Sequence, residues 1–530
     1  MTVTHRVVGP PGCGKTTWLA RQCQRGAEKW GPNAALVISL TRAAAREAGG
    51  RETGLDPRMV GTLHSHCFRA IGMPKVAESG ELLKQWNDEH PQLALSGEDS
   101  WDWGDNRGAG SGDGDRMLSE LSMRRQRMDP REKWPELVSE FSVLWEDYKK
   151  QTSSVDFCDM IERAIDEVPT PPGAPQVIFA DEAQDLSRLE LKLLERWCQS
   201  CEHLTLVYDP AQALYAWRGA DASMAQVEPS IILKQSYRVP RSVQEHALSV
   251  IRNSSTYREA EYLPRDEEGA VRREQWTLRR PEAWVETLDD PFAGTTMVLA
   301  SCSYMLEPLI REMRRLGIPY HNPYSPARWN PLRAGFTRKT ATDRLRAFLD
   351  FSEKEYLTAS ELDLLSTSLK KSGIQLKGAK EAIGKLPEVP EIPDLVRCYK
   401  EVFTGSAIEA LYAQDLDWYR DSLLSGNARS AEFPIAVYKR LGLRQFVEVT
   451  ESDKPVPGCV VVGTIHSVKG GECDRVILFP DMSRAGIRSM DRPGWLHRDG
   501  VWRMFYVGCT RARSELVIGE PCASNLSCQL

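Results

Sequence analysis

The chain has 530 residues, which is too long for one hydrophobic core and predicts three or four domains of about 100 to 200 residues each. No stretch approaches the ~18 consecutive apolar residues that span a bilayer, and no apolar signal region opens the sequence. A soluble cytoplasmic protein with no membrane partner is therefore expected. The formal net charge of −6 excludes a globally basic nucleic-acid-binding protein, so any nucleic-acid surface must be a local groove.

A phosphate-binding loop is predicted directly after the apolar, strand-like run Val3 to Val8. Its sequence GPPGCGKT fits the pattern G-x-x-x-x-G-K-T, in which backbone N–H groups and Lys15 hold phosphates and the Thr16 hydroxyl ligates Mg²⁺. A helix from Thr17 onward would aim its positive end at the same phosphates. An ordinary Gly/Pro turn is the alternative, and the strand before and helix after disfavour it. The predicted ATP-binding residues here are Gly9, Pro10, Pro11, Gly12, Cys13, Gly14, Lys15, Thr16 and Thr17.

Short apolar runs alternate with helical patterns along the rest of the chain, which is typical of parallel sheets covered by helices. The predicted strands are Ala35 to Ser39, Val177 to Ala180, Leu204 to Tyr208, Met297 to Ala300, Val460 to Val462, Arg475 to Phe479 and Glu515 to Ile518. Charged helical patterns replace them in two predicted insertions. The domain prediction is a first core at 1–74 and 152–238 with an insertion at 75–151, and a second core at 239–325 and 432–530 with an insertion at 326–431.

An acidic motif, Asp181-Glu182-Ala183-Gln184-Asp185, follows the strand at Val177 to Ala180. Ligands of α/β proteins bind at such carboxyl strand ends. Asp181 is placed to hold Mg²⁺ through water, and Glu182 to orient and deprotonate the attacking water. A solvated turn is the alternative, and the upstream phosphate loop disfavours it. Ser187 with Glu190 predicts a capping box that opens the next helix.

The segment AQALYAWRGA follows the strand that ends at Tyr208. Gln212 is placed to sense the γ-phosphate, and the exposed Tyr215 and Trp217 offer faces on which bases stack, at about 1 to 3 kcal/mol per base. An aromatic pair packed in a core is the alternative. Flanking Gly, Arg and Asp residues favour a surface turn.

Thirteen cysteines are scattered along the chain, which suits a reducing compartment better than a disulfide framework. Cys198 and Cys201 form a C-x-x-C, and Cys522 and Cys528 lie near the last residue. Four thiols could hold zinc or an iron–sulfur cluster. The spacing lacks two tight pairs, so unrelated thiols are favoured.

Further motifs follow one another along the chain in the order that is typical of one protein family. They are SLTRAAAREA from Ser39, VGTLHSHCFRAIG from Val60, DFCDMI from Asp156, LKQSYR from Leu233, LASCSYMLEPLIREMRRLGIPY from Leu299, GTIHSVKGGE from Gly463 and FYVGCTRAR from Phe505. In this order the chain resembles the UvrD/Rep/PcrA-like helicases of superfamily 1, as a compact member of phage or plasmid type. The resemblance implies two RecA-like cores with parallel sheets, ATP and Mg²⁺ as cofactors, single-stranded and tailed duplex DNA as partners, and a bacterial or phage-infected cytoplasm.

Residue roles follow from the resemblance by position. It implies that Gln212 links the γ-phosphate to the DNA site, that Tyr237 stacks on adenine and that Glu472 meets the ribose. Arg238 and Arg511 would be arginine fingers, each worth about 10³ to 10⁵ in rate. The single strand would contact Thr41, Thr62, His64, Tyr215, Trp217, Thr464 and His466, with Lys469 near the domain junction. For His64 and His466, core packing or helix capping is the alternative.

Several departures from the family pattern matter for function. Leu40 replaces an aromatic residue, Arg42 and Ala43 replace Asn-Lys, Ser236 replaces Asn, and Gly471 replaces Leu. By comparison with the family pattern, the adenine-reading glutamine segment before Gly9 and the strand-separating hairpin after Ile518 are expected to be missing. The chain is predicted to be an ATP-dependent 3′ to 5′ motor on single-stranded DNA. A DNA-stimulated ATPase that displaces proteins and separates strands poorly is the alternative, and a 5′ to 3′ motor is disfavoured by AQALYAWRGA.

Overall fold

The computed structural model describes residues 3–39, 53–97, 112–220, 228–289, 294–324, 330–332, 339–354, 356–387, 390–452, 454–494 and 496–530. The chain divides into two compact units. Unit 1 contains Met1–Thr277, Leu299–Met305 and Gly463–Leu530, and unit 2 contains Leu278–Val298 and Leu306–Val462. In these described ranges, no helix combines the length and the apolar character needed to cross a bilayer.

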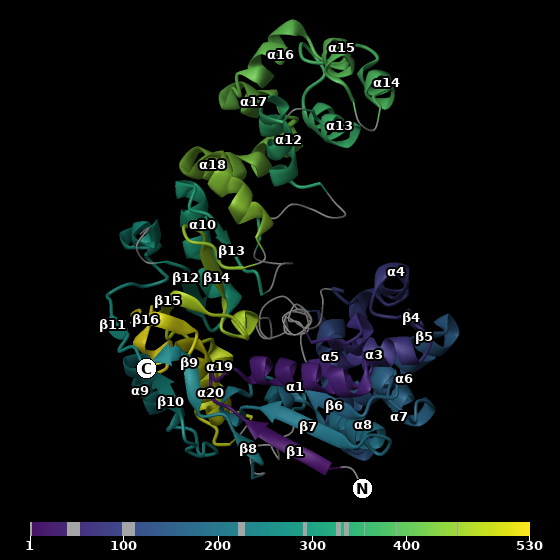
Figure 1. Ribbon diagram of the computed structural model, residues 1–530, viewed down its shortest axis with the longest axis vertical. Helices are drawn as coiled ribbons and strands as arrows, with labels where there is room; N and C mark the ends of the chain where they lie inside the picture. The colour runs from purple at the N-terminus through teal and green to yellow at the C-terminus, as the bar shows by residue number, and fades with distance from the viewer. Residues whose placement is uncertain are drawn as a thin grey trace. The chain divides into compact units, whose positions relative to one another are not determined.

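A six-stranded sheet with the order β3-β2-β6-β7-β1-β8 forms the N-terminal part of unit 1, and its strands β1, β6, β7 and β8 are labelled in Figure 1. Its strands are β1 (Val3–Val8), β2 (Ala35–Ser39), β3 (Val60–Thr62), β6 (Val177–Ala180), β7 (His203–Tyr208) and β8 (Ile231–Ile232). All neighbours pair in parallel, with Val8 opposite Tyr208 and Ala180 opposite Leu206. This register places Gly9, Asp181 and Asp209 just beyond adjacent strand ends, at one edge of the sheet.

Helices cover both faces of this sheet. One hydrophobic cluster joins Leu204 and Leu206 of β7 to helices α3 (Leu63–Ala70), α7 (Phe157–Glu167) and α8 (Arg188–Cys198). The other joins Val207 of the same strand to α1 (Lys15–Trp30). Because successive strand residues point to opposite faces, a continuous apolar run fits a strand that is buried on both sides.

A smaller helical part follows α3 in the chain. It comprises β4 (Lys75–Val76), α4 (Gly80–Glu89), α5 (Asp113–Gln126), α6 (Glu136–Thr152) and β5 (Ser154–Val155). Its core is aromatic: Trp86 packs edge-on against Trp145 at 4.9 Å between ring centroids and against Tyr148 at 5.2 Å. Edge-to-face pairs of this kind are favourable beyond the area that they bury.

A second parallel sheet contains β11 (Ala270–Arg273), β16 (Ala512–Ile518) and β15 (Cys473–Leu478) in unit 1. The Phe479 N–H donates to the carbonyl of Leu299, and the Ile465 N–H to that of Ala300. These bonds tie the sheet to the ends of β12 (Thr296–Ala300) and β14 (Val460–Thr464) within the same unit. The remaining elements of this part are β9 (Gln235–Pro240), α9 (Arg241–Ile251), β10 (Leu263–Arg265), α19 (Arg484–Met490) and α20 (Arg498–Cys509).

Unit 2 is mainly helical. Its strand β13 (Tyr320–His321) pairs in parallel with the start of β14. Its helices, coloured teal to green in Figure 1, are α10 (Glu307–Leu316), α12 (Ala341–Glu353), α13 (Ala359–Ser368), α14 (Ala379–Gly384), α15 (Ile392–Val402), α16 (Gly405–Tyr412), α17 (Leu416–Ser422) and α18 (Ser425–Glu451). Gly442 interrupts α18 with φ 74°. Thr340 and Thr358 open α12 and α13 with capping boxes, in which side chain and backbone satisfy each other's end groups.

The predicted fold class of parallel-sheet α/β cores is confirmed. The strands Val3–Val8, Ala35–Ser39 and Val177–Ala180 have the predicted limits, and the capping box of Ser187 with Glu190 is present. The strand predicted at Arg475 to Phe479 is β15, Cys473–Leu478. The domain limits stay a prediction.

Candidate ATP and single-strand site

The loop between β1 and α1 depends on its glycines. Gly12 and Gly14 have φ values of 75° and 76°, in the left-handed region that favours glycine. A Cβ on Gly12 would lie 2.5 Å from the Cβ of Arg238, and one on Gly9 would lie 2.2 Å from the Cys13 Sγ. Side chains are therefore excluded where the backbone must approach a ligand.

Lys15, Thr16 and Asp181 meet at the strand ends. The Lys15 Nζ donates to the Gly9 carbonyl at 2.8 Å, and the Thr16 Oγ1 donates to the Asp181 Oδ2 at 3.4 Å. Asp181 is only 3% exposed. A hydroxyl and a carboxylate at this separation are the oxygen ligands that Mg²⁺ prefers, so the residues present fit the predicted metal.

The other loop residues have structural partners. The Pro11 carbonyl accepts hydrogen bonds from the Ser236 Oγ at 2.9 Å and from the Tyr262 hydroxyl at 3.2 Å. The Cys13 thiol is buried, and burial raises its pKa. Pro10 precedes this turn, and Thr17 lies in the first turn of α1. Hydrogen bonds from residues in and next to β9 and β10 thus hold the loop in place.

Glu182 occupies a strained position next to Asp181. Its φ is 55°, which is rare for a non-glycine residue and often marks a functional site. Its Oε2 accepts a hydrogen bond from the Gln184 Nε2 and lies 3.4 Å from the Lys469 Nζ. Burial by itself would raise the pKa of Glu182, but the charges of Lys469 and Lys15 lower it to about 2. The carboxylate is therefore ionised, as a group that orients water must be.

Arg511 reaches the end of β7 from the C-terminal segment. Its Nη2 donates to the Gln212 Oε1 at 2.8 Å, and the Gln212 Nε2 donates to the Asp209 Oδ2 at 2.6 Å. The Arg511 Nε donates to the Val507 carbonyl at 3.0 Å, and the side chain is buried. The structure therefore brings together two residues that are 299 positions apart and that were both predicted to act on the γ-phosphate.

Arg238, Tyr237 and Glu472 lie on the other side of the loop. The Tyr237 N–H donates to the Gly12 carbonyl at 2.8 Å, and its side chain is 70% exposed. A flat aromatic side chain this open beside the loop suits stacking on a base. The Arg238 Nε donates to the Glu472 Oε2 at 2.5 Å, and Glu472 also contacts Arg513 at 3.1 Å. The predicted ribose contact of Glu472 stays a prediction.

The predicted single-strand residues Thr62 and Thr464 have the same local structure. Each threonine Oγ1 accepts from the N–H of the serine three positions later, at 3.2 Å in both cases. Each serine hydroxyl donates back to the threonine carbonyl, Ser65 at 2.7 Å and Ser467 at 2.9 Å. The sequence analysis missed this pair, although GTLHS from Gly61 and GTIHS from Gly463 differ at one position.

Tyr215 is not exposed, so the prediction that it offers an open face for stacking is wrong. It is 8% exposed, and its ring centroid lies 6.3 Å from that of His466 and 5.3 Å from the Lys469 Nζ. An ammonium over a ring face is attractive, which explains why the aromatic ring turns inward here. Thr41, Leu40, Arg42 and Ala43 lie outside the described residues, as does the side chain of Trp217.

His64 and His466 each lie two positions after the threonine of their turn, Thr62 or Thr464. His64 is 8% exposed and packs edge-on against Phe157 at 5.8 Å. Burial, with the charge of Arg218 next, lowers the pKa of His64 to about 3. Burial, with the charge of Lys469 next, lowers the pKa of His466 to about 4. The neutral rings, buried at His64 and half-buried at His466, fit the core-packing alternative, while the contacts with DNA stay predictions.

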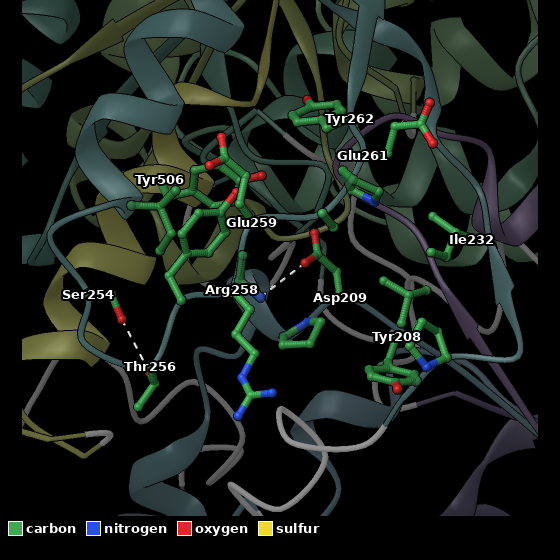
Figure 2. A pocket seen from close by; sticks show the side chains of 18 of the residues that line it. Tyr208, Asp209, Ile232, Ser254, Thr256, Arg258, Glu259, Glu261, Tyr262 and Tyr506 are labelled. Atoms are coloured by element: carbon green, nitrogen blue, oxygen red, sulfur yellow. Dashed lines mark hydrogen bonds between the residues drawn. The ribbon is translucent and has the colours of Figure 1, made fainter.

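A cavity of about 350 Å³ lies behind the phosphate loop (Figure 2). It is lined by the end of β7 with Asp209, by the segment 254–262 and by α20 with Arg503 and Tyr506. The Arg503 Nε donates to the Ala213 carbonyl at 3.1 Å, and its Nη1 to the Thr256 Oγ1 at 3.2 Å. These bonds hold α20 against the segment that carries Gln212.

We expect His66 to make unfolding sensitive to acid. Its Nε2 lies 3.2 Å from the Val37 carbonyl and its Nδ1 3.0 Å from Arg69, so a second ring proton would face a guanidinium. Burial and then Arg69 lower its pKa from 6.5 to about 4. The unfolded chain therefore binds the proton more tightly. The contribution of neutral His66 to the free energy of unfolding is fully present above pH 6.5 and is lost as the pH falls through about 4.

Denaturant titrations of the wild type and of His66→Gln between these pH values measure this effect. The wild type should lose up to about 1.4 kcal/mol more per pH unit than the variant, which is one proton's contribution. Equal slopes for both proteins would show that His66 is not the responsible group.

The comparisons with known proteins agree with this geometry. Residues 2–229 match the family described as UvrD/REP helicase N-terminal domain. Over 304 residues the chain is 27% identical to the ATP-dependent DNA helicase PcrA of Bacillus subtilis, covering 49% of this chain and 39% of the relative. It is 22% identical over 296 residues to a probable DNA helicase II homolog of Mycoplasma capricolum, covering 50% of this chain and 41% of the relative.

A third relative, the ATP-dependent DNA helicase PcrA of Staphylococcus aureus, is 29% identical over 131 residues, which are 22% of this chain and 18% of the relative. The matches thus span at most 41% of the length of these three relatives. The phosphate loop, the acidic motif and Gln212 all fall within residues 2–229, so this part of the chain is similar to the UvrD/Rep/PcrA-like helicases of superfamily 1.

Proposed function

We propose that the chain is an ATP-dependent translocase on single-stranded DNA and a helicase, moving 3′ to 5′. The observation that carries this proposal is the bond between Arg511 and Gln212, 2.8 Å long and next to the phosphate loop. A C-terminal arginine that meets the phosphate-sensing segment is what a hydrolase needs when turnover depends on closing two parts of the chain. The similarity to DNA helicases supports DNA as the partner.

The residues divide the work of hydrolysis. Lys15 and the backbone of the loop hold the β- and γ-phosphates, and Glu182 orients the attacking water and accepts its proton. Arg238 and Arg511 stabilise the charge that develops on the transferred phosphoryl group. Mg²⁺, held by Thr16 and through water by Asp181, would neutralise phosphate charge when bound.

Coupling to DNA would run through the segment after β7. Gln212 accepts from Arg511 at one end of this segment, and Tyr215 packs against the turn that contains Thr464 and His466 near its other end. Movement of a DNA strand across that turn would therefore displace Tyr215, and the same segment would transmit the displacement to Gln212 and its contact with Arg511. Tailed duplex DNA is the proposed substrate for unwinding.

Steady-state ATPase assays with and without a single-stranded oligonucleotide test this function. We expect the rate to rise at least about tenfold with DNA, equivalent to 1.4 kcal/mol of barrier. Equal rates would refute the motor. Strand displacement on duplexes with a 3′ or a 5′ tail then decides polarity, and stimulated hydrolysis with no displacement on either would favour the protein-displacing ATPase instead.

A further inference from the structure

Lys469 is a buried cation that touches several predicted catalytic groups at once. Its side chain is 6% exposed. Its Nζ binds the Asp185 carboxylate, lies 3.4 Å from the Glu182 Oε2 and donates to the Gln212 carbonyl at 3.2 Å. An ammonium has three N–H donors, and these acceptors match them. The charge is thus fully partnered by the acidic motif and by the phosphate-sensing segment.

The same lysine belongs to the turn predicted to contact the single strand. It ends the short helix His466–Val468, and its N–H donates to the His466 carbonyl at 3.3 Å. The ring of Tyr215 lies near both side chains, with its centroid 6.3 Å from that of His466 and 5.3 Å from the Lys469 ammonium. Only five positions separate Lys469 from Thr464. A displacement of this turn would therefore carry the backbone of Lys469 with it and strain the contact of its ammonium with Glu182.

The Lys469 ammonium and the Gln184 amide both face one oxygen of Glu182, the Oε2. A carboxylate oxygen can accept from both, and the two contacts fix the orientation of the carboxylate. A general base needs a carboxylate oxygen within hydrogen-bond reach of the attacking water, at about 2.6 to 3.2 Å. In the arrangement seen, the ion pair holds the carboxylate toward Lys469 and stabilises its ionised form, which weakens it as an acceptor for the proton of the attacking water.

We propose that Lys469 is a positioning residue that restrains Glu182 while the single-strand site is empty, and that releases it when a bound strand moves the Thr464–Ser467 turn. The inference rests on the proposed function, since it presumes that Glu182 acts on water and that DNA occupies this turn. On this proposal, the ion pair between Lys469 and Glu182 causes the low rate of ATP hydrolysis without DNA. DNA-dependent activation then needs no change in the phosphate loop.

The decisive variant is the double substitution Lys469→Met with Asp185→Asn. Lysine loss alone would leave two buried carboxylates together, whereas the asparagine Oδ1 retains an acceptor for the Leu214 and Tyr215 N–H groups, which Asp185 binds at 3.1 and 3.2 Å. Lys469→Arg keeps a cation at the site. Lys149→Met is the matched control, because that lysine is also 6% exposed and also binds two carboxylates, Asp156 and Asp159, in the helical part.

Initial ATPase rates are measured with and without oligo-dT, with kcat and KM for ATP determined separately. We expect the double variant to hydrolyse ATP without DNA about tenfold faster than the wild type, with its DNA stimulation reduced by a similar factor and KM changed less than about twofold. Lys469→Arg and Lys149→Met should keep the wild-type ratio. A purely structural role would lower rates, so a gain without DNA is specific to restraint.

An unchanged or lower DNA-free rate in a folded double variant would overturn the inference. Thermal melting establishes folding for each variant. Failure of the proposed function is distinguishable, because it is seen in the wild type itself: without stimulation by oligo-dT the motor is refuted, whereas a stimulated wild type with an unaltered double variant refutes only the role of Lys469.

Discussion

Replacing Glu182 with Gln should lower kcat for ATP hydrolysis by about 10²- to 10⁴-fold while ATP still binds. The amide keeps the size of the side chain and an acceptor for the Gln184 amide, but it cannot take a proton from water. Phosphate contacts come from Lys15 and the loop backbone, so they are retained. Quenched-flow or coupled-enzyme rates give kcat, and titration with a fluorescent ATP analogue gives the affinity.

Two further variants define what the loss means. Lys15→Ala should abolish turnover and also weaken ATP binding, because it removes the charge that faces the phosphates. Glu162→Gln is the matched control. The Glu162 carboxylate lies in α7, is 41% exposed and binds Arg125 at 2.6 Å. It should retain wild-type rates. If Glu182→Gln hydrolysed ATP at a wild-type rate, another group would have to be the base.

The strands and the phosphate loop could be predicted because local sequence determines them. Runs such as Val177 to Ala180 are apolar on both faces and are followed by polar motifs, and the glycines at 12 and 14 are required by backbone angles that other residues avoid. These constraints act between neighbouring residues, so they can be recognised in one amino-acid sequence. The limits of the strands were correct to within two or three residues.

The environment of Tyr215 could not be predicted in this way. Its flanking Gly and Arg residues favour a surface turn, but His466 and Lys469, which bury it, are about 250 positions away. The ion pair of Lys469 with Asp185 could not be predicted for the same reason, because the partners are 284 positions apart. The paired turns of Thr62 and Thr464 did leave a signal, since G-T-x-H-S occurs twice in the sequence.

Arg511→Ala should reduce kcat by about 10³-fold or more while ATP binding remains, because an arginine finger acts mainly on the charge of the transition state. The guanidinium also donates to the carbonyls of Val507 and Gly471, at 3.0 and 3.2 Å. Truncation removes one donor from each carbonyl; the Val507 carbonyl keeps the Thr510 hydroxyl at 3.1 Å, so the cost of about 1 to 3 kcal/mol falls mainly on the Gly471 carbonyl. Melting temperature is therefore measured beside kcat and affinity.

Arg511→Lys separates the catalytic role from the structural one. Lysine restores the positive charge but not the planar fork that can hold Gln212 and a phosphate oxygen together, so a well-folded Arg511→Lys enzyme should still be strongly impaired. Arg272→Ala removes an arginine from β11 that is 51% exposed and binds Glu515 at 2.7 Å, and it should leave kcat unchanged. Loss of ATP binding in Arg511→Lys would instead assign this arginine to the architecture of the site, since an arginine that acts only in the transition state is not needed to hold the ground state.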